Sequence, residues 1–159
     1  MSNYVIYKGE LYHYGVPGMK WGVRKNESNA GNIKTLSKKI RTDMTDEDRD
    51  KINAEMDNKV RNSDAMKKFT KDHMNEYEAN LREQNELRKK MIDDNTFFDD
   101  NAPKTKESKR YDELVNKEWD SLTKIAKDIV GKNGDKNVIH DTAVSVRRVL
   151  EAEIKNKKK

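Results

Sequence analysis

The side chains of this sequence that could do chemistry are histidines and carboxylates, and their spacing forms no reactive group. His13, His73 and His140 lie far apart, and none has a second histidine at metal-ligand spacing on one helix face. His73 falls among the apolar positions of a predicted helix, whereas His140 precedes Asp141 near a helix start. We interpret His73 as a packed imidazole and His140 as a capping or surface residue, and we predict no metal site.

The other patterns that support catalysis also argue against an enzyme. The chain has no cysteine, which excludes thiolate zinc sites and disulfides. A general acid–base pair needs apolar surroundings to separate its two pKa values, and only 33% of the residues are apolar. Neither Gly-x-Gly-x-x-Gly nor Gly-x-x-x-x-Gly-Lys-Ser/Thr, the glycine patterns of phosphate-binding loops, occurs. We therefore predict a protein that is not an enzyme and takes no cofactor.

Charge is spread along the whole chain rather than gathered on one face. Charged residues make up 40% of the sequence, and 34 basic side chains nearly balance 29 acidic ones, for a net charge of +5. Alternating signs are typical of solvated helix faces, whereas a dedicated nucleic-acid binder has a one-sided basic surface. We expect no nucleic-acid partner, and we interpret the basic tail, residues 156–159, as a solvated end.

The first 25 residues differ from the rest, because they hold five of the eleven aromatic residues and four of the seven glycines. Tyr4–Tyr7 and Leu11–Tyr14 have strand-like composition, which favours a small β-hairpin. A two-stranded hairpin is marginal alone, so this segment must dock on something. The residues we expect to bind a partner follow or overlap the second strand: His13, Tyr14, Gly15, Gly18, Met19, Lys20, Trp21, Gly22 and Arg24.

Two interpretations of this segment stay open. Tryptophan and arginine dominate the energetics of protein interfaces, which favours a docking segment over residues 1–25, carried on a flexible linker over residues 26–44. Alternatively, the aromatic residues fold back over the helical body and complete its core. Stacking of single-stranded bases on Tyr14 and Trp21, flanked by lysine and arginine, is a weaker third alternative.

Residues 13–25, His-Tyr-Gly-Val-Pro-Gly-Met-Lys-Trp-Gly-Val-Arg-Lys, resemble a short motif of proteins from tailed bacteriophages and prophages of Gram-positive bacteria. There the motif is found near the N-terminus of small helical proteins and in minor head proteins. The resemblance implies a virion-associated protein that is made in the bacterial host cytoplasm and docks on a capsid, portal or other head protein. It implies no catalytic role.

The rest of the chain predicts a mainly α fold with about four helices. Two charged helices are expected over residues 45–94, because Thr45 and Ser63 are good N-caps and three acidic residues follow Thr45. Residues 95–108 contain Asn, Asp and Pro and predict a loop. No apolar run approaches the roughly 18 residues of a membrane span, so we expect no contact with a membrane.

Residues 109–155 have the strongest helical periodicity and predict an antiparallel helical hairpin, in which Gly131 ends the first helix. Its apolar face is predicted to run through Leu114, Trp119, Leu122 and Ile125. The low apolar content predicts thin helical layers, and self-association through the helices would add to their stability.

Three functions compete at this point. The leading one is a structural or accessory protein of the virion, active in head morphogenesis through protein–protein contacts. The first alternative is a small phage-encoded inhibitor or regulator of a host protein. The second is a packaging accessory that contacts nucleic acid.

Overall fold

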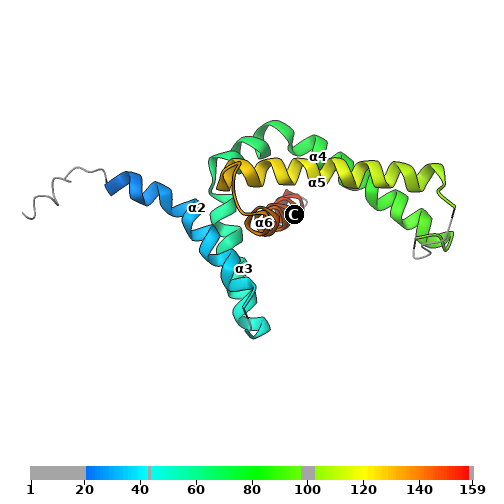
Figure 1. Ribbon diagram of the computed structural model, residues 1–159. Helices are drawn as coiled ribbons and strands as arrows, with labels where there is room; N and C mark the ends of the chain where they lie inside the picture. Colours follow the sequence, from blue (N-terminus) through cyan, green and yellow to red (C-terminus); the bar gives the residue numbers. More distant parts are fainter. Residues whose placement is uncertain (1–20, 43, 98–102, 158–159) are drawn as a thin grey trace, which may run out of the picture.

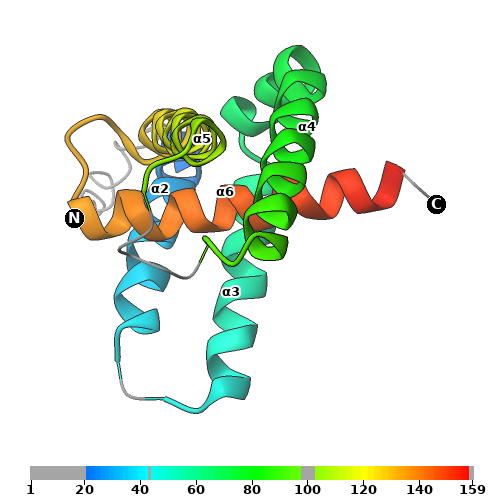
Figure 2. The same cartoon turned by 90° about the vertical axis from the view of Figure 1, so that its right-hand side faces the viewer.

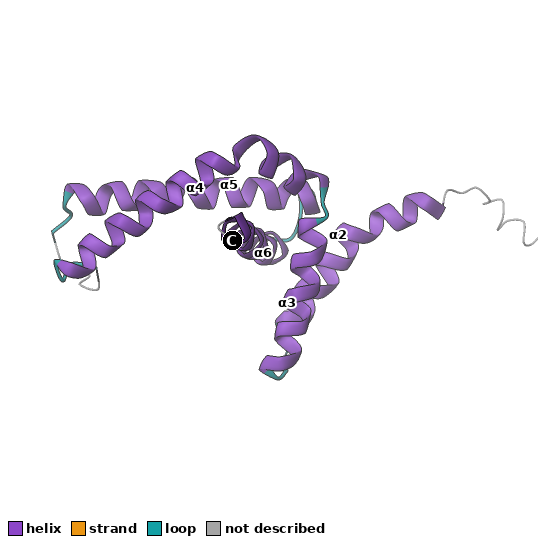
Figure 3. Cartoon of the chain, turned by 180° about the vertical axis from the view of Figure 1, so that it is seen from behind, coloured by secondary structure: helices purple, strands orange, loops and turns teal. Residues whose placement is uncertain are grey.

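The structure, a computed structural model, describes residues 21–42, 44–97 and 103–157. It is mainly α, and within these residues every regular element is a helix (Figure 3). The predicted N-terminal β-hairpin lies outside the described residues. The helices are α2 (Trp21–Ile40), α3 (Asp46–Arg61), α4 (Asp64–Asp93), α5 (Lys106–Val130) and α6 (Lys136–Lys157).

Local signals set most of the helix ends. Thr45 and Ser63 cap α3 and α4 as predicted, because their side chains accept hydrogen bonds from the backbone N–H groups of Asp48 and Met66. Thr105 caps α5 in the same way, so that helix begins three residues before the expected start. Gly131 ends α5 with a φ of +97°, a conformation that glycine adopts without the strain a side chain would cause.

Helix α6 lies at the centre of the molecule and packs against α2, α3, α4 and α5. Figure 1 shows α5 along its length and α6 nearly end-on, and Figure 2 shows the reverse, so the two helices cross steeply. The predicted antiparallel hairpin of α5 and α6 is therefore wrong. The reason is that α6 is apolar or small on several sides, and a helix of that kind is stable only when neighbours cover all of those sides. Its buried residues are Val138, Ile139, Thr142, Ala143, Ser145, Val146, Val149, Leu150 and Ile154.

The antiparallel pair is instead α4 with α5. Three ion pairs join them in reversed order along the chain, with Lys117 on Glu76, Arg110 on Glu83 and Lys90 on Glu107. The pair extends well beyond α6 at the end where α4 leads into α5 (Figure 1).

The flexible linker predicted over residues 26–44 is also wrong, since α2 runs through most of it. Residues 26–32, Asn-Glu-Ser-Asn-Ala-Gly-Asn, suggested a linker because all but one are polar or glycine. They are outweighed by an apolar face further along, where Ile33 and Leu36 are buried and Ile40 packs against the core. Gly31 lies in this helix with open space around its Cα. A helical glycine costs about 1 kcal/mol relative to alanine, which burial of two large side chains exceeds.

The buried faces of α4 and α5 differ in part from those predicted. His73 is exposed rather than packed in the core, and Met74, one residue further, is buried. On α5, Trp119 is 37% exposed, whereas Glu118 is only 5% exposed. The buried row on α5 follows Leu114, Glu118 and Leu122 at intervals of four, so the helix turns a carboxylate, not the indole, toward α4 and α6.

Candidate functional site

The predicted docking residues fall at and before the start of α2. His13, Tyr14, Gly15, Gly18, Met19 and Lys20 lie outside the described residues. Trp21, Gly22 and Arg24 lie in the first turns of α2, where the structure describes the backbone but not the side chains. The part of α2 that carries these three residues projects away from the other helices (Figure 1).

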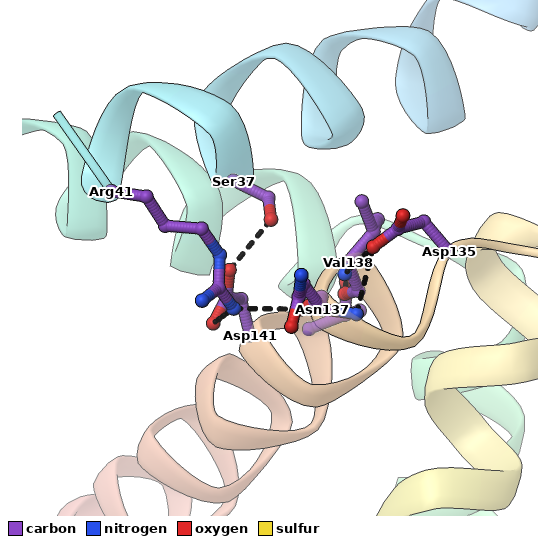
Figure 4. A network of polar contacts seen from close by, with 7 residues as sticks. Ser37, Arg41, Asp135, Asn137, Val138 and Asp141 are labelled. Atoms are coloured by element: carbon purple, nitrogen blue, oxygen red, sulfur yellow. Dashed lines mark hydrogen bonds and ion pairs between the residues drawn. The ribbon is translucent and has the colours of Figure 1, made fainter.

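The second half of α2 is fixed to α6 by a polar cluster around Asp141. The Ser37 hydroxyl donates to Asp141 Oδ2 at 2.6 Å, and Arg41 Nη2 donates to Oδ1 at 2.8 Å (Figure 4). Arg41 also donates to the backbone oxygen of Asn137 at 3.3 Å. Ser37 is buried and Asp141 is mostly covered, so these bonds fix the direction in which α2 leaves the body.

A second cluster fixes α3 to α6. Arg148 makes a two-pronged contact with Asp57, with Nη2 at 2.6 Å from Oδ1 and Nε at 2.9 Å from Oδ2. The buried hydroxyl of Ser145 donates to the same Oδ1 at 2.5 Å. Paired contacts between arginine and a carboxylate are strong and set the relative orientation of the two groups.

The third cluster is the most buried and joins α4, α5 and α6 through Glu118. Its Oε1 accepts from the Tyr77 hydroxyl at 2.9 Å and lies 3.3 Å from Arg147 Nε. Its Oε2 accepts from Gln84 Nε2 at 3.0 Å. Both carboxylate oxygens are thus satisfied, which is the condition for burying a carboxylate at tolerable cost.

The electrostatics of this cluster suit a structural contact rather than proton transfer. Burial raises the pKa of the Tyr77 hydroxyl well above its usual value of 10.0, and the neighbouring Glu118 carboxylate raises it further. Burial alone would lower the pKa of Arg147, but the carboxylates of Glu118 and Glu151 outweigh that effect and raise it. Near neutral pH the phenol keeps its proton and the guanidinium keeps its charge.

A groove of about 370 Å³ lies beside this cluster, between α4 and α5. The rings of Phe69, His73 and Tyr77 follow one another along one wall, with centroid distances of 5.3 Å and 6.2 Å from Phe69 to the other two. Lys117 reaches across to Glu76 at 2.8 Å, and this hydrogen bond lowers the pKa of that carboxyl. The groove is mixed in charge and has an aromatic wall, so it can hold a side chain of a partner but contains no activated nucleophile.

Two further properties limit the chemistry of the described part of the chain. It holds no group of three or more histidine, cysteine or acidic side chains that could bind a metal ion. Among the helices with described positions, none combines the length and the apolar character that crossing a membrane requires.

The sequence contained a signal for the Glu118 cluster that we did not use. Tyr77, Gln84 and Met91 recur every seven residues on α4, and all three are buried. A glutamine at a seven-residue spacing between two large apolar residues points inward with them, and a buried amide requires a polar partner on the facing helix. A prediction that uses only the spacing of apolar residues places Gln84 and Glu118 on the surface.

Residues 4–28 are similar to a family of unknown function, DUF7211. Neither a curated protein nor a solved structure matches the chain. The match covers the aromatic, glycine-rich segment and ends inside α2, so it leaves out nearly all of the described helices.

Proposed function

We propose that this protein is a bacteriophage virion-associated structural or accessory protein, whose N-terminal segment docks on a capsid, portal or other head protein. The segment that docks contains the predicted partner-binding residues from His13 to Arg24. The helical body is the accessory part that the segment brings to the particle. The protein acts by protein–protein contact, in the host cytoplasm during assembly and then in the virion.

One observation carries the proposal: the family match and the folded core occupy separate parts of the chain. The match spans residues 4–28 and includes the whole motif that resembles phage head proteins. The first buried residue of α2 is Ile33. The segment that is similar to other proteins therefore ends before the buried core begins, and a short aromatic segment rich in glycine suits binding to a partner.

The arrangement of α2 supports this division. Ile33 is twelve positions after Trp21 along the helix, a distance of about 18 Å at 1.5 Å per residue. A helical spacer of this length lies between Trp21 and the core, and the Ser37–Asp141–Arg41 cluster fixes the other end of the spacer. The last residues of the motif are therefore joined to the body by a helix rather than by the flexible linker predicted from the sequence.

The test is the abundance of the protein in purified particles. Particles from cells that express the wild-type chain, the double variant Trp21→Ala/Arg24→Ala, or the control Lys38→Ala are compared by quantitative mass spectrometry. Lys38 is exposed on α2, so its variant changes the same helix without touching the motif. We expect the wild type and the control to be abundant in particles and the double variant to be depleted at least tenfold.

Absence of the wild-type protein from particles would contradict the proposal. That result would favour a host-directed inhibitor or regulator, which binds a bacterial protein and does not enter the virion. Equal incorporation of all three chains would leave a virion protein but would exclude the N-terminal segment as its means of attachment.

A further inference from the structure

A hollow of about 300 Å³ lies where α5 crosses α6, separate from the Glu118 cluster. Its polar lining consists of Trp119, Thr123, Lys127, Lys136 and His140. Two of these side chains are cationic, one is a titratable imidazole, and none is a carboxylate. In a chain with nearly as many acidic as basic residues, a hollow without an acidic side chain attracts anions.

Trp119 gives the hollow an aromatic surface that the core does not use. Among the described residues, only Trp119 and Ile92 are large hydrophobic side chains that stay exposed. Its indole meets the His140 ring edge-on, with 5.6 Å between centroids, and this contact fixes the indole at the rim of the hollow. An exposed tryptophan held in place is a platform on which a flat ring can stack.

The two lysines are free to bind a ligand. Lys127 comes from α5 and Lys136 from α6, and neither forms an ion pair with any residue whose position the structure gives. In the groove between α4 and α5, by contrast, Lys117 is neutralised by Glu76. Asp135, next to Lys136, instead accepts hydrogen bonds from the backbone N–H groups of Asn137 and Val138 (Figure 4).

From this geometry we propose that the hollow binds a segment of single-stranded nucleic acid. One base stacks on the indole of Trp119, and the adjoining phosphates contact Lys127 and Lys136. Aromatic platforms flanked by lysines are how proteins bind single strands without reading their sequence. A free nucleotide fits less well, because small-molecule sites enclose most of their ligand and this indole lies at the surface. An acidic peptide would use the lysines but not the stacking surface.

The test is binding of a fluorescently labelled single DNA strand of mixed sequence to the full chain, measured by fluorescence anisotropy. The variants are Trp119→Ala, Trp119→Phe and the double variant Lys127→Glu/Lys136→Glu. The matched control is Lys67→Glu/Lys71→Glu, which changes the net charge equally at two exposed positions of α4. Circular dichroism melting confirms that each variant is folded.

We expect Trp119→Ala and Lys127→Glu/Lys136→Glu each to weaken binding about tenfold or more, and Trp119→Phe to stay near the wild type because a ring remains. The control should weaken binding by less than about threefold, since only the overall field changes. Lys127→Gln/Lys136→Gln should reduce the slope of log affinity against log salt by about 1.4, because each phosphate contact on a single strand contributes about 0.7.

Three outcomes would overturn the inference. Equal losses in the hollow and control variants would mean binding by net charge alone. Binding of a free mononucleotide as tightly as the strand would mean a small-molecule site. Binding of a glutamate-rich peptide as tightly as the strand, insensitive to Trp119→Ala, would mean a protein partner.

Discussion

The two halves of the α4–α5 pair are built from the same two helices, but different interactions hold each half together. The half beside α6 contributes Met66, Met74, Leu122 and Ile125 to the main hydrophobic core. In the far half, Met91 and Leu114 are buried but lie outside that core. Glu118 marks the boundary, because Arg147 of α6 reaches it there.

The far half relies on contacts at the surface. Its ion pairs, Arg110 with Glu83 and Lys90 with Glu107, are short but largely solvent-exposed. Phe97 packs edge-on against Tyr111 at 5.7 Å, with the Arg88 guanidinium 5.2 Å from its ring. The difference teaches that the presence of a third helix, α6, decides how strongly polar groups between α4 and α5 affect stability. Where α6 covers the pair, these groups are buried and costly to leave unpaired, and where it does not, they are exposed and contribute little.

The largest expected effect comes from the half beside α6. Leu150 of α6 is fully buried, so Leu150→Ala removes apolar contacts and leaves a cavity, which should lower the free energy of unfolding by about 4 kcal/mol. Urea denaturation measures it. The control is Ile92→Ala in the far half, where the side chain is 38% exposed and the loss should be about 0.5 kcal/mol or less. Similar losses in the two variants would contradict the difference in stability between the two halves of the α4–α5 pair.

Removing the boundary carboxylate should have the next largest effect. Glu118→Ala leaves the Tyr77 hydroxyl without its partner and Arg147 without one of its two carboxylates. The Gln84 amide keeps only its long hydrogen bond of 3.4 Å to the backbone oxygen of Leu114. Because Arg147 keeps some solvent contact, we expect the low end of the range for a broken buried pair, about 3 kcal/mol. Urea denaturation again reports the change. The control is the double variant Glu118→Met/Tyr77→Phe, which removes the carboxylate and the phenol hydroxyl together. If it lowers the free energy of unfolding as much as Glu118→Ala does, lost packing rather than unpaired polar groups is the cause.

The pKa of Tyr77 predicts how the covered half responds to alkali. Its folded-state pKa is raised above the unfolded value of 10.0. The stability that the protonated Tyr77 hydroxyl gives the folded state is therefore complete below pH 10 and is lost as the pH rises above it. The free energy of unfolding should fall by about 1.4 kcal/mol for each pH unit above 10. Denaturation at a series of alkaline pH values tests this, and Tyr77→Phe should remove this part of the slope. An unchanged slope in the variant would contradict the assignment.

A smaller effect is expected where α2 meets α6. Asp141→Asn weakens the bonds from Ser37 and Arg41, but Arg41 is 43% exposed and water replaces part of the loss. We expect about 1 kcal/mol, together with faster amide hydrogen exchange confined to α2. Exchange measured by mass spectrometry resolves this, with α4 and α5 as internal controls. Faster exchange throughout the chain would show that α2 is part of one cooperative unit with the α4–α5 pair.

The smallest effect should come from the exposed ion pairs of α4 and α5. Hydrogen bonds from Arg110 and Lys90 lower the pKa values of Glu83 and Glu107 from their usual 4.5. A lowered folded-state pKa gives stability that is present above 4.5 and is lost as the pH falls through the folded-state value. Carboxyl titration by NMR should show both midpoints below 4.5, and high salt should move them back. Midpoints unaffected by salt would mean that these pairs are better shielded than their exposure indicates.

Several helix ends could be predicted from the sequence where a local signal marks them, although the cap Thr105 was missed and α5 begins three residues before its predicted start. Thr45 and Ser63 start helices because their side chains accept hydrogen bonds from the backbone N–H groups three residues further on, and Gly131 ends one because its φ is positive. These signals act within a few residues and need no partner. The start of α2 was not predictable in this way, because Asn and Gly outnumber apolar residues there and the stabilising contacts of Ile33 and Leu36 lie on other helices.

The features of the fold and of the candidate site fall into two groups, those that the sequence determined and those that only the tertiary structure decided. The sequence alone determined the mainly helical class, the capped starts of α3 and α4, and the distinct aromatic, glycine-rich composition of the first 25 residues. Only the tertiary structure decided that α6 lies at the centre and contacts the four other described helices, that Glu118 is buried, and that Trp119 stays at the surface beside His140. The physical reason is the distance along the chain over which the interactions act. Caps and turns depend on neighbouring residues, whereas the buried face of a helix depends on its contacts with every helix packed around it.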